Sequence, residues 1–260
     1  MNPNNKIEYI NLFSIPGITA FSTCRGCIIE GDNYSGFNAC HYTGDDINHV
    51  YDCRAVLCEV LDINQSDLII PRQTHSLNVA VINETPVNVD YIENVDAIVT
   101  TLPDVAIAVN TADCVPIVLI DEVARVIAVV HSGWKGTVGR IVAKTVATMV
   151  ECGANVSRIE VAMGPCICGD CFEVGDEVVE LFKNAGFDNP KVILKGYASR
   201  DHIDLSQACR QSLLEIGILD ENIIMPTVCS RCNPSKFFSA RRLGINSGRT
   251  LTVVKLSAIS

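Results

Sequence analysis

Residues 95–136 read VDAIVTTLPDVAIAVNTADCVPIVLIDEVARVIAVVHSGWKG, and four short apolar runs follow one another within them. The runs are rich in valine and isoleucine, and turn-forming residues separate them. This pattern predicts four buried β-strands in succession, over residues 95–100, 105–109, 116–120 and 125–130. We therefore expect a core that is built on β-sheet.

Helical and strand patterns are mixed on both sides of this stretch. Apolar residues recur at helical spacing over residues 136–152, and Gly153 ends that pattern. Residues 31–46 are rich in Gly, Asn and Asp, so most of the first sixty residues are expected to be loop. Further helices are expected over residues 47–61, 174–185 and 204–216, and further strands over 68–70, 79–82, 159–163, 192–195, 223–227 and 250–256. Because strict β-α-β alternation is missing, the mixture favours a layered α+β fold in one domain, residues 1–260.

Composition limits the classes of function. The 260 residues are 48% hydrophobic and 19% charged, and their net charge is −10. Such an acidic chain lacks the basic footprint that nucleic-acid binding needs. No apolar stretch reaches the roughly 18 to 20 residues of a membrane span, and residues 1–11 have no secretory-signal pattern. We expect a cytoplasmic protein without nucleic-acid or membrane partners, whose 13 cysteines are mainly reduced thiols.

Three potential metal ligands lie beside the ends of expected strands. They are His75 in the segment QTH, Cys114 in the segment ADC and His131 in the segment HSGWKG. Two imidazoles and one thiolate leave a fourth position open, which is typical of catalytic zinc sites. Spacing alone does not show convergence, because a surface histidine, a core cysteine and a hydrogen-bonded strand-end histidine fit the same positions. If the three converge, the chain carries a metal-activated reaction centre.

A second group of cysteines lies in two later segments. Cys166, Cys168 and Cys171 belong to the segment GPCICGDC, and Cys229 and Cys232 form a CxxC pair. The arrangement is compatible with partly buried free thiols, with a four-thiolate structural zinc site and with a disulfide.

Several polar residues are candidates for binding an anionic substrate. Arg241 and Arg242 follow two aromatic residues in the segment FFSARR, and Arg249 follows Gly248. Guanidinium groups bind phosphate through paired hydrogen bonds, although solvated surface arginines give the same pattern. Further candidates lie toward the N-terminus, namely Arg25, Asn38, His41, Arg54 and Arg72.

Taken together, these motifs resemble the YfiH family, also called laccase-domain or polyphenol-oxidase-like proteins, which is associated with purine nucleoside phosphorylase activity. The matching segments are QTH at 73–75, N-TADC at 110–114, HSGWKG at 131–136, GPCICGDCFEV at 164–174 and CSRCNPSKFFSARR at 229–242. They occur in order over nearly the whole chain, which is more specific than any one motif. One departure is TCRGC at residues 23–27, where Cys24 stands in place of the arginine of the family's Thr-Arg-x-Gly-Gly pattern and Arg25 is its neighbour.

The resemblance implies a four-layer α-β-β-α sandwich, similar to a cytotoxic-necrotizing-factor deamidase domain. It implies that His75, Cys114 and His131 bind zinc, although copper also binds such N/S sites in vitro. The implied reactions are phosphorolysis of adenosine, inosine and methylthioadenosine, and deamination of adenosine. Cys114, His131 and Asp113 are then the catalytic candidates, with Asp113 either transferring a proton or orienting a ligand. The paired arginines of FFSARR become candidates for binding phosphate.

Other functions stay open at this level. Cys114 as nucleophile with His131 as base describes a cysteine hydrolase, including one that edits cell-wall precursors. A metal-binding or redox protein without turnover is the non-enzymatic alternative. A copper-binding polyphenol oxidase is less favoured, because several coppers need many imidazoles and the chain has 5 histidines. The expected partners are purine nucleosides and phosphate, and the expected state is a monomer or small homo-oligomer.

Overall fold

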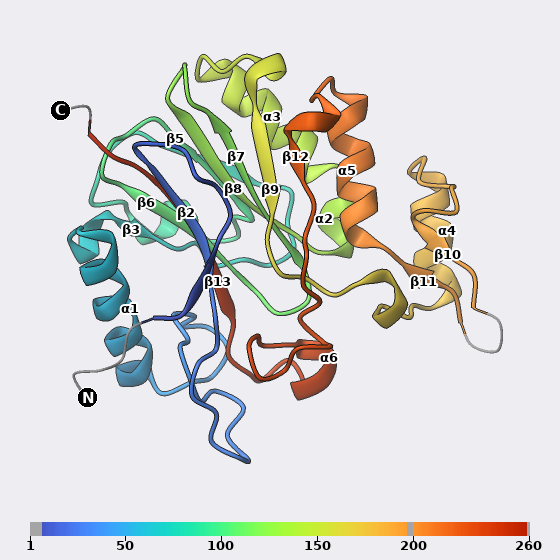
Figure 1. Ribbon diagram of the computed structural model, residues 1–260, viewed down its shortest axis with the longest axis horizontal. Coiled ribbons are helices and arrows are strands. Elements are labelled where there is room, and N and C mark those ends of the chain that lie inside the picture. The colour runs from blue at the N-terminus through green and yellow to red at the C-terminus, as the bar shows by residue number, and fades with distance from the viewer. Residues whose placement is uncertain (1–6, 197–199, 259–260) are drawn as a thin grey trace.

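The computed structural model of the protein describes residues 7–196 and 200–258 (Figure 1). Residues 1–6, which belong to the segment expected to lack a secretory signal, lie outside the described residues. The helices are α1 (Ile47–Leu61), α2 (Trp134–Val138), α3 (Ile141–Glu151), α4 (Asp176–Asn184), α5 (Leu205–Glu215) and α6 (Ala240–Leu243). The strands are β1 (Tyr9–Asn11), β2 (Ile18–Thr23), β3 (Leu68–Ile69), β4 (Val79–Ile82), β5 (Ala97–Thr100), β6 (Ala106–Thr111), β7 (Val115–Asp121), β8 (Val126–Ser132), β9 (Glu160–Met163), β10 (Ile193–Leu194), β11 (His202–Ile203), β12 (Ile223–Ile224) and β13 (Thr250–Leu256). Within the described ranges, every helix falls short of the length and hydropathy needed to cross a bilayer.

Two sheets form the centre of the fold. The five-stranded sheet has the order β1-β2-β13-β6-β3, and the six-stranded sheet has the order β12-β9-β7-β8-β5-β4. Strands β10 and β11 pair separately, near α4 at the end of the molecule away from α1 (Figure 1). Although β6 and β7 follow one another in the chain, they belong to different sheets. The turn at residues 112–114 therefore crosses from one sheet to the other.

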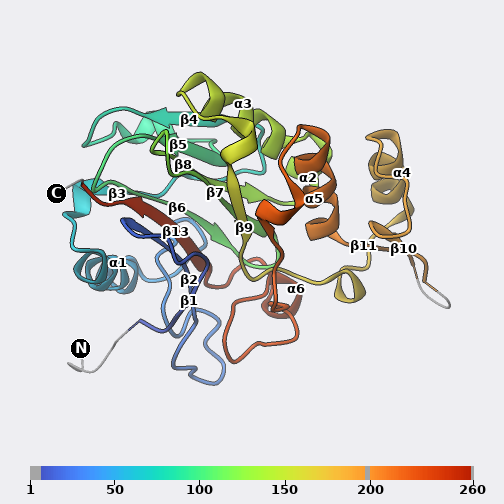
Figure 2. The same cartoon turned by 45° about the horizontal axis from the view of Figure 1, so that its top comes forward.

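The central strands are largely apolar because both of their faces are covered. In β7, Ile117 and Leu119 pack on the side of α3 and α5, whereas Val118 and Ile120 pack toward the five-stranded sheet. On the far side of that sheet, Leu57 of α1 joins alternate residues of β6 and β13 in a separate core cluster. Figure 2 shows α1 on one side of the sheets, with α3 and α5 on the other. Burial on both faces explains why these strands show no alternation of polar and apolar residues.

This architecture confirms the mixed α and β class, and the four strands expected over residues 95–130 are β5 to β8. The described residues before 47 are mainly loop, as expected, but residues 18–23 form a strand that was not predicted, β2, next to the central strand β13. That strand has five of six residues buried, so its sequence ITAFST lacks the alternation that marks a half-exposed strand.

The helix expected over residues 136–152 is also wrong in its bounds, because the chain forms two helices there. The first, α2, begins at Trp134, and the second, α3, begins after Arg140, which has a positive φ of 60°. Gly139 lies so close to Leu77 that a β-carbon there would be 2.5 Å from a leucine methyl group. The break between α2 and α3 places Gly139, which has no side chain, at the close contact with Leu77, and α3 then continues along the sheet.

Candidate active site

A cavity of about 950 Å³ opens at the crossing turn between β6 and β7. Its walls come from the loop after β3, the β6–β7 turn, the end of β8, the start of α2 and residues 240–249. Sites for drug-sized ligands have volumes of roughly 300–1,000 Å³. The cavity is therefore large enough for a small organic molecule of that size.

Three of the lining residues are His75, Cys114 and His131. Each offers one ligand atom, and the three atoms lie within 4.8 Å of one another. Cys114 Sγ is 3.7 Å from Nε2 of His75, and the two imidazole rings lie with their centres 4.7 Å apart. Two nitrogen donors and one sulfur donor at these separations fit a single metal ion of the zinc class, with one coordination position left for another group.

Asp96, directly before β5, holds two parts of this cluster. Its side chain is fully buried, and Oδ1 accepts a hydrogen bond of 2.7 Å from Nδ1 of His131. The same carboxylate accepts backbone N–H bonds from Thr74, His75 and Ser76. With Nδ1 bonded to Asp96, the imidazole of His131 presents Nε2 to the cavity. A carboxylate behind a ligating histidine is the usual way in which proteins orient such ligands.

Backbone geometry brings the donors this close. His75 has a positive φ of 60°, which costs a non-glycine residue about 1–2 kcal/mol. Gly133 caps α2 directly beside the cluster, and a β-carbon there would lie 2.6 Å from His75 Cδ2 and 2.9 Å from Cys114 Sγ. The glycine of the HSGWKG segment therefore leaves the space that the histidine and the thiol occupy.

The electrostatics of the cluster favour a thiolate. Burial alone would raise the pKa of Cys114, but the charge of His131 and hydrogen bonds from His131 and His75 lower it to about 6. Burial alone would lower the pKa of His131, but the Cys114 thiolate and Asp96 raise it to about 9. At neutral pH the pair is thus a thiolate beside an imidazolium, and a divalent cation can replace the proton between them.

Asp113 and Arg241 lie side by side in the cavity wall. Asp113 accepts hydrogen bonds of 2.7 Å from the hydroxyl of Ser230 and from the backbone N–H of Arg241. The guanidinium of Arg241 donates to the carbonyl of Glu173 and lies over the ring of Phe172, 5.0 Å from its centre. Asp113, which directly precedes Cys114 in the chain, therefore fixes the start of α6 and with it the position of Arg241.

Most of the other predicted anion-binding residues bond to protein groups outside the cavity wall. Arg242 donates to the carbonyl of Arg231, and Arg72 forms an exposed ion pair with Glu93. Arg54 contacts Ala39 and His41, and Arg25 contacts Asp32, Ser35 and the ring of Phe238. Asn38 donates to Asp45 and also accepts a hydrogen bond from the backbone N–H of Arg249, which lines the cavity. Arg25, the neighbour of the family's missing arginine, thus holds its own loop.

Several residues of the site were not among the predicted site residues. Asp96 lies in an apolar run, VDAIVT, and was not predicted. Its carboxylate at the start of an expected buried strand is the sequence feature that could have identified it. Asn110 lines the cavity. Its side-chain Nδ2 and Oδ1 are both buried, and neither forms a hydrogen bond of normal length and angle with the described residues. Arg249, by contrast, was among the predicted anion-binding candidates, and it does line the cavity, where its guanidinium is held by carbonyls of Ile245 and Ser247.

Fold and site together define a protein of two packed sheets with a His–Cys–His cluster of the metal-binding type in a small-molecule cavity. The family model described as multi-copper polyphenol oxidoreductase laccase matches residues 19–257, and the chain belongs to this family. The resemblance to the YfiH family is confirmed by a solved relative, the YfiH protein of Bacillus licheniformis. It is 25% identical to this chain, has a TM-score of 0.90 and covers 99% of this chain and 100% of its own.

Two relatives with curated names are similar over almost their full length. Adenosine deaminase RL5, from an unknown prokaryotic organism, is 51% identical, covering 92% of this chain and 94% of that protein. A purine nucleoside phosphorylase of Bacteroides thetaiotaomicron is 36% identical, covering 96% of both. Since both relatives are named as enzymes, the prediction that this chain is an enzyme is confirmed.

Proposed function

We propose that the protein is a zinc-dependent purine nucleoside phosphorylase that also deaminates adenosine, with adenosine, inosine and methylthioadenosine as substrates. The observation that carries the proposal is the convergence of His75, Cys114 and His131 at one point of the cavity. The names of the two similar proteins supply the reaction class.

The three-donor cluster fits the metal requirement of this proposal. A zinc ion held there would supply Lewis-acid activation of water or of a polar substrate group. Asp96 keeps the imidazole of His131 oriented, and Asp113 keeps the wall beside Cys114 in place. Because His75, Cys114 and His131 all line the cavity, a zinc ion held by them would be accessible to a substrate bound there.

For phosphorolysis, the chain itself must hold phosphate beside the sugar and bind the leaving base. Arg241 and Arg249 are the lining residues that carry a guanidinium group, and both side chains are held by backbone carbonyls. The amide of Asn110 offers a donor and an acceptor to a purine edge, and Trp134 and Phe172 offer apolar ring surfaces for stacking. These groups give the cavity both an anion-binding part and a base-binding part.

The test compares wild-type protein with Cys114→Ala and, as a matched control, with Cys27→Ala, whose thiol is exposed away from this cavity. Metal content, distinguishing zinc from copper, is measured beside turnover of inosine and adenosine with and without phosphate. Cys114→Ala is expected to lose about one zinc per chain, together with phosphate-dependent release of hypoxanthine and release of ammonia. Unchanged metal content in Cys114→Ala, or wild-type protein without purine turnover, would contradict the proposal.

A cysteine hydrolase is the second candidate, and one observation favours it. Asp96, His131 and Cys114 are arranged as orienting acid, base and nucleophile, with the pKa of Cys114 lowered to about 6 although burial alone would raise it. Chelation separates the two candidates. A thiolate nucleophile keeps its activity when metal is removed and loses it to iodoacetamide, whereas the proposed phosphorylase loses purine turnover on chelation and regains it with zinc.

A further inference from the structure

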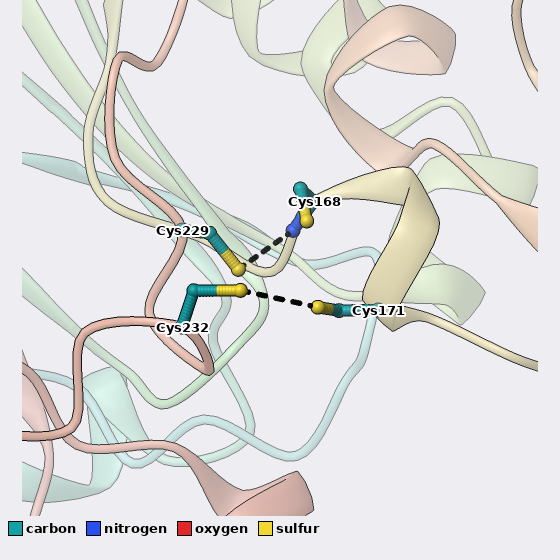
Figure 3. Close-up of side chains that lie close together, drawn as sticks. All are labelled: Cys168, Cys171, Cys229 and Cys232. Carbon is teal, nitrogen blue, oxygen red and sulfur yellow. Dashed lines mark hydrogen bonds between the residues drawn. The ribbon is translucent and has the colours of Figure 1, made fainter.

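A second group of potential metal ligands lies outside the His–Cys–His cluster. It consists of four residues, called here the four-cysteine cluster: Cys168, Cys171, Cys229 and Cys232. Their sulfur atoms lie within 4.8 Å of one another and point toward a common space (Figure 3). Zinc bonds to sulfur at about 2.3 Å, so a zinc tetrahedron separates its sulfurs by about 3.8 Å. The cluster is within a small side-chain adjustment of that geometry.

The backbone holds the two CxxC segments against each other. Cys166 and Cys229 form a parallel β-bridge, and the N–H of Ser230 donates to the carbonyl of Cys166 at 2.9 Å. Each segment then turns tightly: the N–H of Cys171 donates to the carbonyl of Cys168, and that of Asn233 donates to the carbonyl of Cys229. Two tight turns on neighbouring segments therefore bring two pairs of thiols to one place, although about sixty residues separate the pairs.

Gly169 supports the tightness of the first turn. A β-carbon at this position would lie 2.6 Å from Leu194 Cδ1 and 3.1 Å from Asp204 Cβ. The turn therefore packs directly against the β10–β11 region and is held in its conformation from outside. Cys166, by contrast, is only 2% exposed and belongs to the main hydrophobic core, so it is not a fifth member of the cluster.

Donors around the cluster suit sulfur atoms that carry negative charge. The backbone N–H of Cys168 donates to Cys229 Sγ at 3.3 Å, and the guanidinium of Arg231 donates to Cys171 Sγ at 3.3 Å. Thiolates this close repel one another. Burial and the neighbouring cysteines raise the pKa of Cys168, and the neighbouring cysteines raise the pKa of Cys232, so all four groups can be deprotonated together only when a divalent cation is bound between them. An all-sulfur donor set selects soft or borderline metals, among which zinc forms closed tetrahedral structural sites.

We propose that the four-cysteine cluster is a structural zinc site that fastens residues 164–173 to residues 229–242. Both segments form part of the cavity wall. Ser230, inside the second CxxC turn, donates to Asp113, and Phe172, directly after Cys171, lies under Arg241. The zinc thus fixes the positions of Asp113 and Arg241 without contacting substrate, and this assignment does not depend on which reaction the cavity catalyses.

A disulfide is the competing state, because Cys171 Sγ and Cys232 Sγ are 3.4 Å apart. A disulfide between these two sulfurs would not explain why the sulfurs of Cys168 and Cys229 also lie at the same place. Convergence of all four, with a backbone donor aimed at Cys229, favours the metal.

The test uses full-length protein purified with reductant and analysed for zinc, iron and copper. Wild type is expected to hold about two zinc ions per chain, and the double variant Cys171→Ser/Cys232→Ser about one. Cys114→Ala is also expected to hold about one, which separates this site from the His–Cys–His cluster. Cys27→Ser, an exposed cysteine elsewhere, is expected to match wild type in zinc content and melting temperature.

The double variant is expected to melt several degrees lower than wild type, because one structural metal is lost. If it does not fold, cobalt substitution in Cys114→Ala still tests the proposal. Cobalt in four thiolates gives the intense visible and charge-transfer absorption of a tetrahedral sulfur site. Absence of that spectrum, iron in place of zinc, a Cys171–Cys232 disulfide in the reduced preparation, or unchanged zinc content in the double variant would each overturn it.

Discussion

The substitution Asp96→Asn is expected to damage the His–Cys–His cluster although it removes no ligand. The carboxylate accepts five hydrogen bonds and donates none: Oδ1 takes those of His131 and His75, and Oδ2 takes the backbone N–H groups of Thr74 and Ser76 and the Ser76 hydroxyl. An asparagine amide places an NH₂ group where one of these oxygens stood. In either orientation of the amide, a donor then faces at least two other donors.

The size of the effect follows from this count. Hydrogen bonds to a charged group contribute about 1.5–3 kcal/mol each, so losing two costs about 3–6 kcal/mol of folding free energy before relaxation. Part of that loss falls on His131, whose imidazole is no longer held in place. Loss of a carboxylate behind a ligating histidine typically weakens metal binding about 10- to 100-fold. We expect both effects in the variant.

Zinc affinity is measured by competition with a chromophoric chelator, and stability by urea unfolding. Asp52→Asn is the matched control, because Asp52 is exposed on α1 and the same substitution there removes no buried acceptor. If Asp96→Asn binds zinc as tightly as the control and unfolds at the same urea concentration, the argument that Asp96 organises the cluster is refuted.

Three further predictions test other parts of the structure. Gly133→Ala is expected to reduce zinc binding and activity at least about 10-fold, because its methyl group would occupy ligand space; equal zinc affinity would contradict this. Arg241→Ala is expected to raise the KM for phosphate, whereas Arg242→Ala, outside the cavity wall, is expected to leave it unchanged; lost activity without a rise in phosphate KM would count against phosphate binding by Arg241. Despite its burial, Arg158 and backbone donors keep the pKa of Asp121 below its usual value, so Asp121 stabilises the fold above about pH 4 and loses this effect as the pH falls. The stability difference between wild type and Asp121→Asn, measured by urea unfolding, should therefore shrink from pH 6 to pH 3.

The sequence predicted the central strands well, because runs such as VPIVLI and VIAVV are apolar on both faces and have few alternatives. It did not predict β2, whose mixed residues are buried by partners more than 200 positions away in β13. It also did not predict the break at Gly139, which depends on the distant Leu77. Long-range packing of this kind leaves no periodic pattern in the local sequence.

The site likewise contains residues that the sequence predicted and residues that it did not. His75, Cys114 and His131 were predicted as ligands from residue type and motif, and the structure places their donor atoms together. Asp96 was not predicted, because a single aspartate in an apolar run has no spacing to identify its partners. The four cysteines left three alternatives open in the sequence, because the β-bridge between Cys166 and Cys229 that brings the two CxxC turns together is a long-range contact.

The geometry of His75 bears on the choice between a metal centre and a thiol nucleophile. A Cys–His–Asp triad is complete with Cys114, His131 and Asp96, and it needs no second imidazole. Yet the chain holds His75 in a backbone conformation that costs about 1–2 kcal/mol, fixes it through Asp96, and keeps Gly133 without a side chain to admit it. A second imidazole maintained at that cost has a role in the proposed metal site and none in a Cys–His–Asp triad. The metal-dependent function is therefore the one that uses every feature of the cluster.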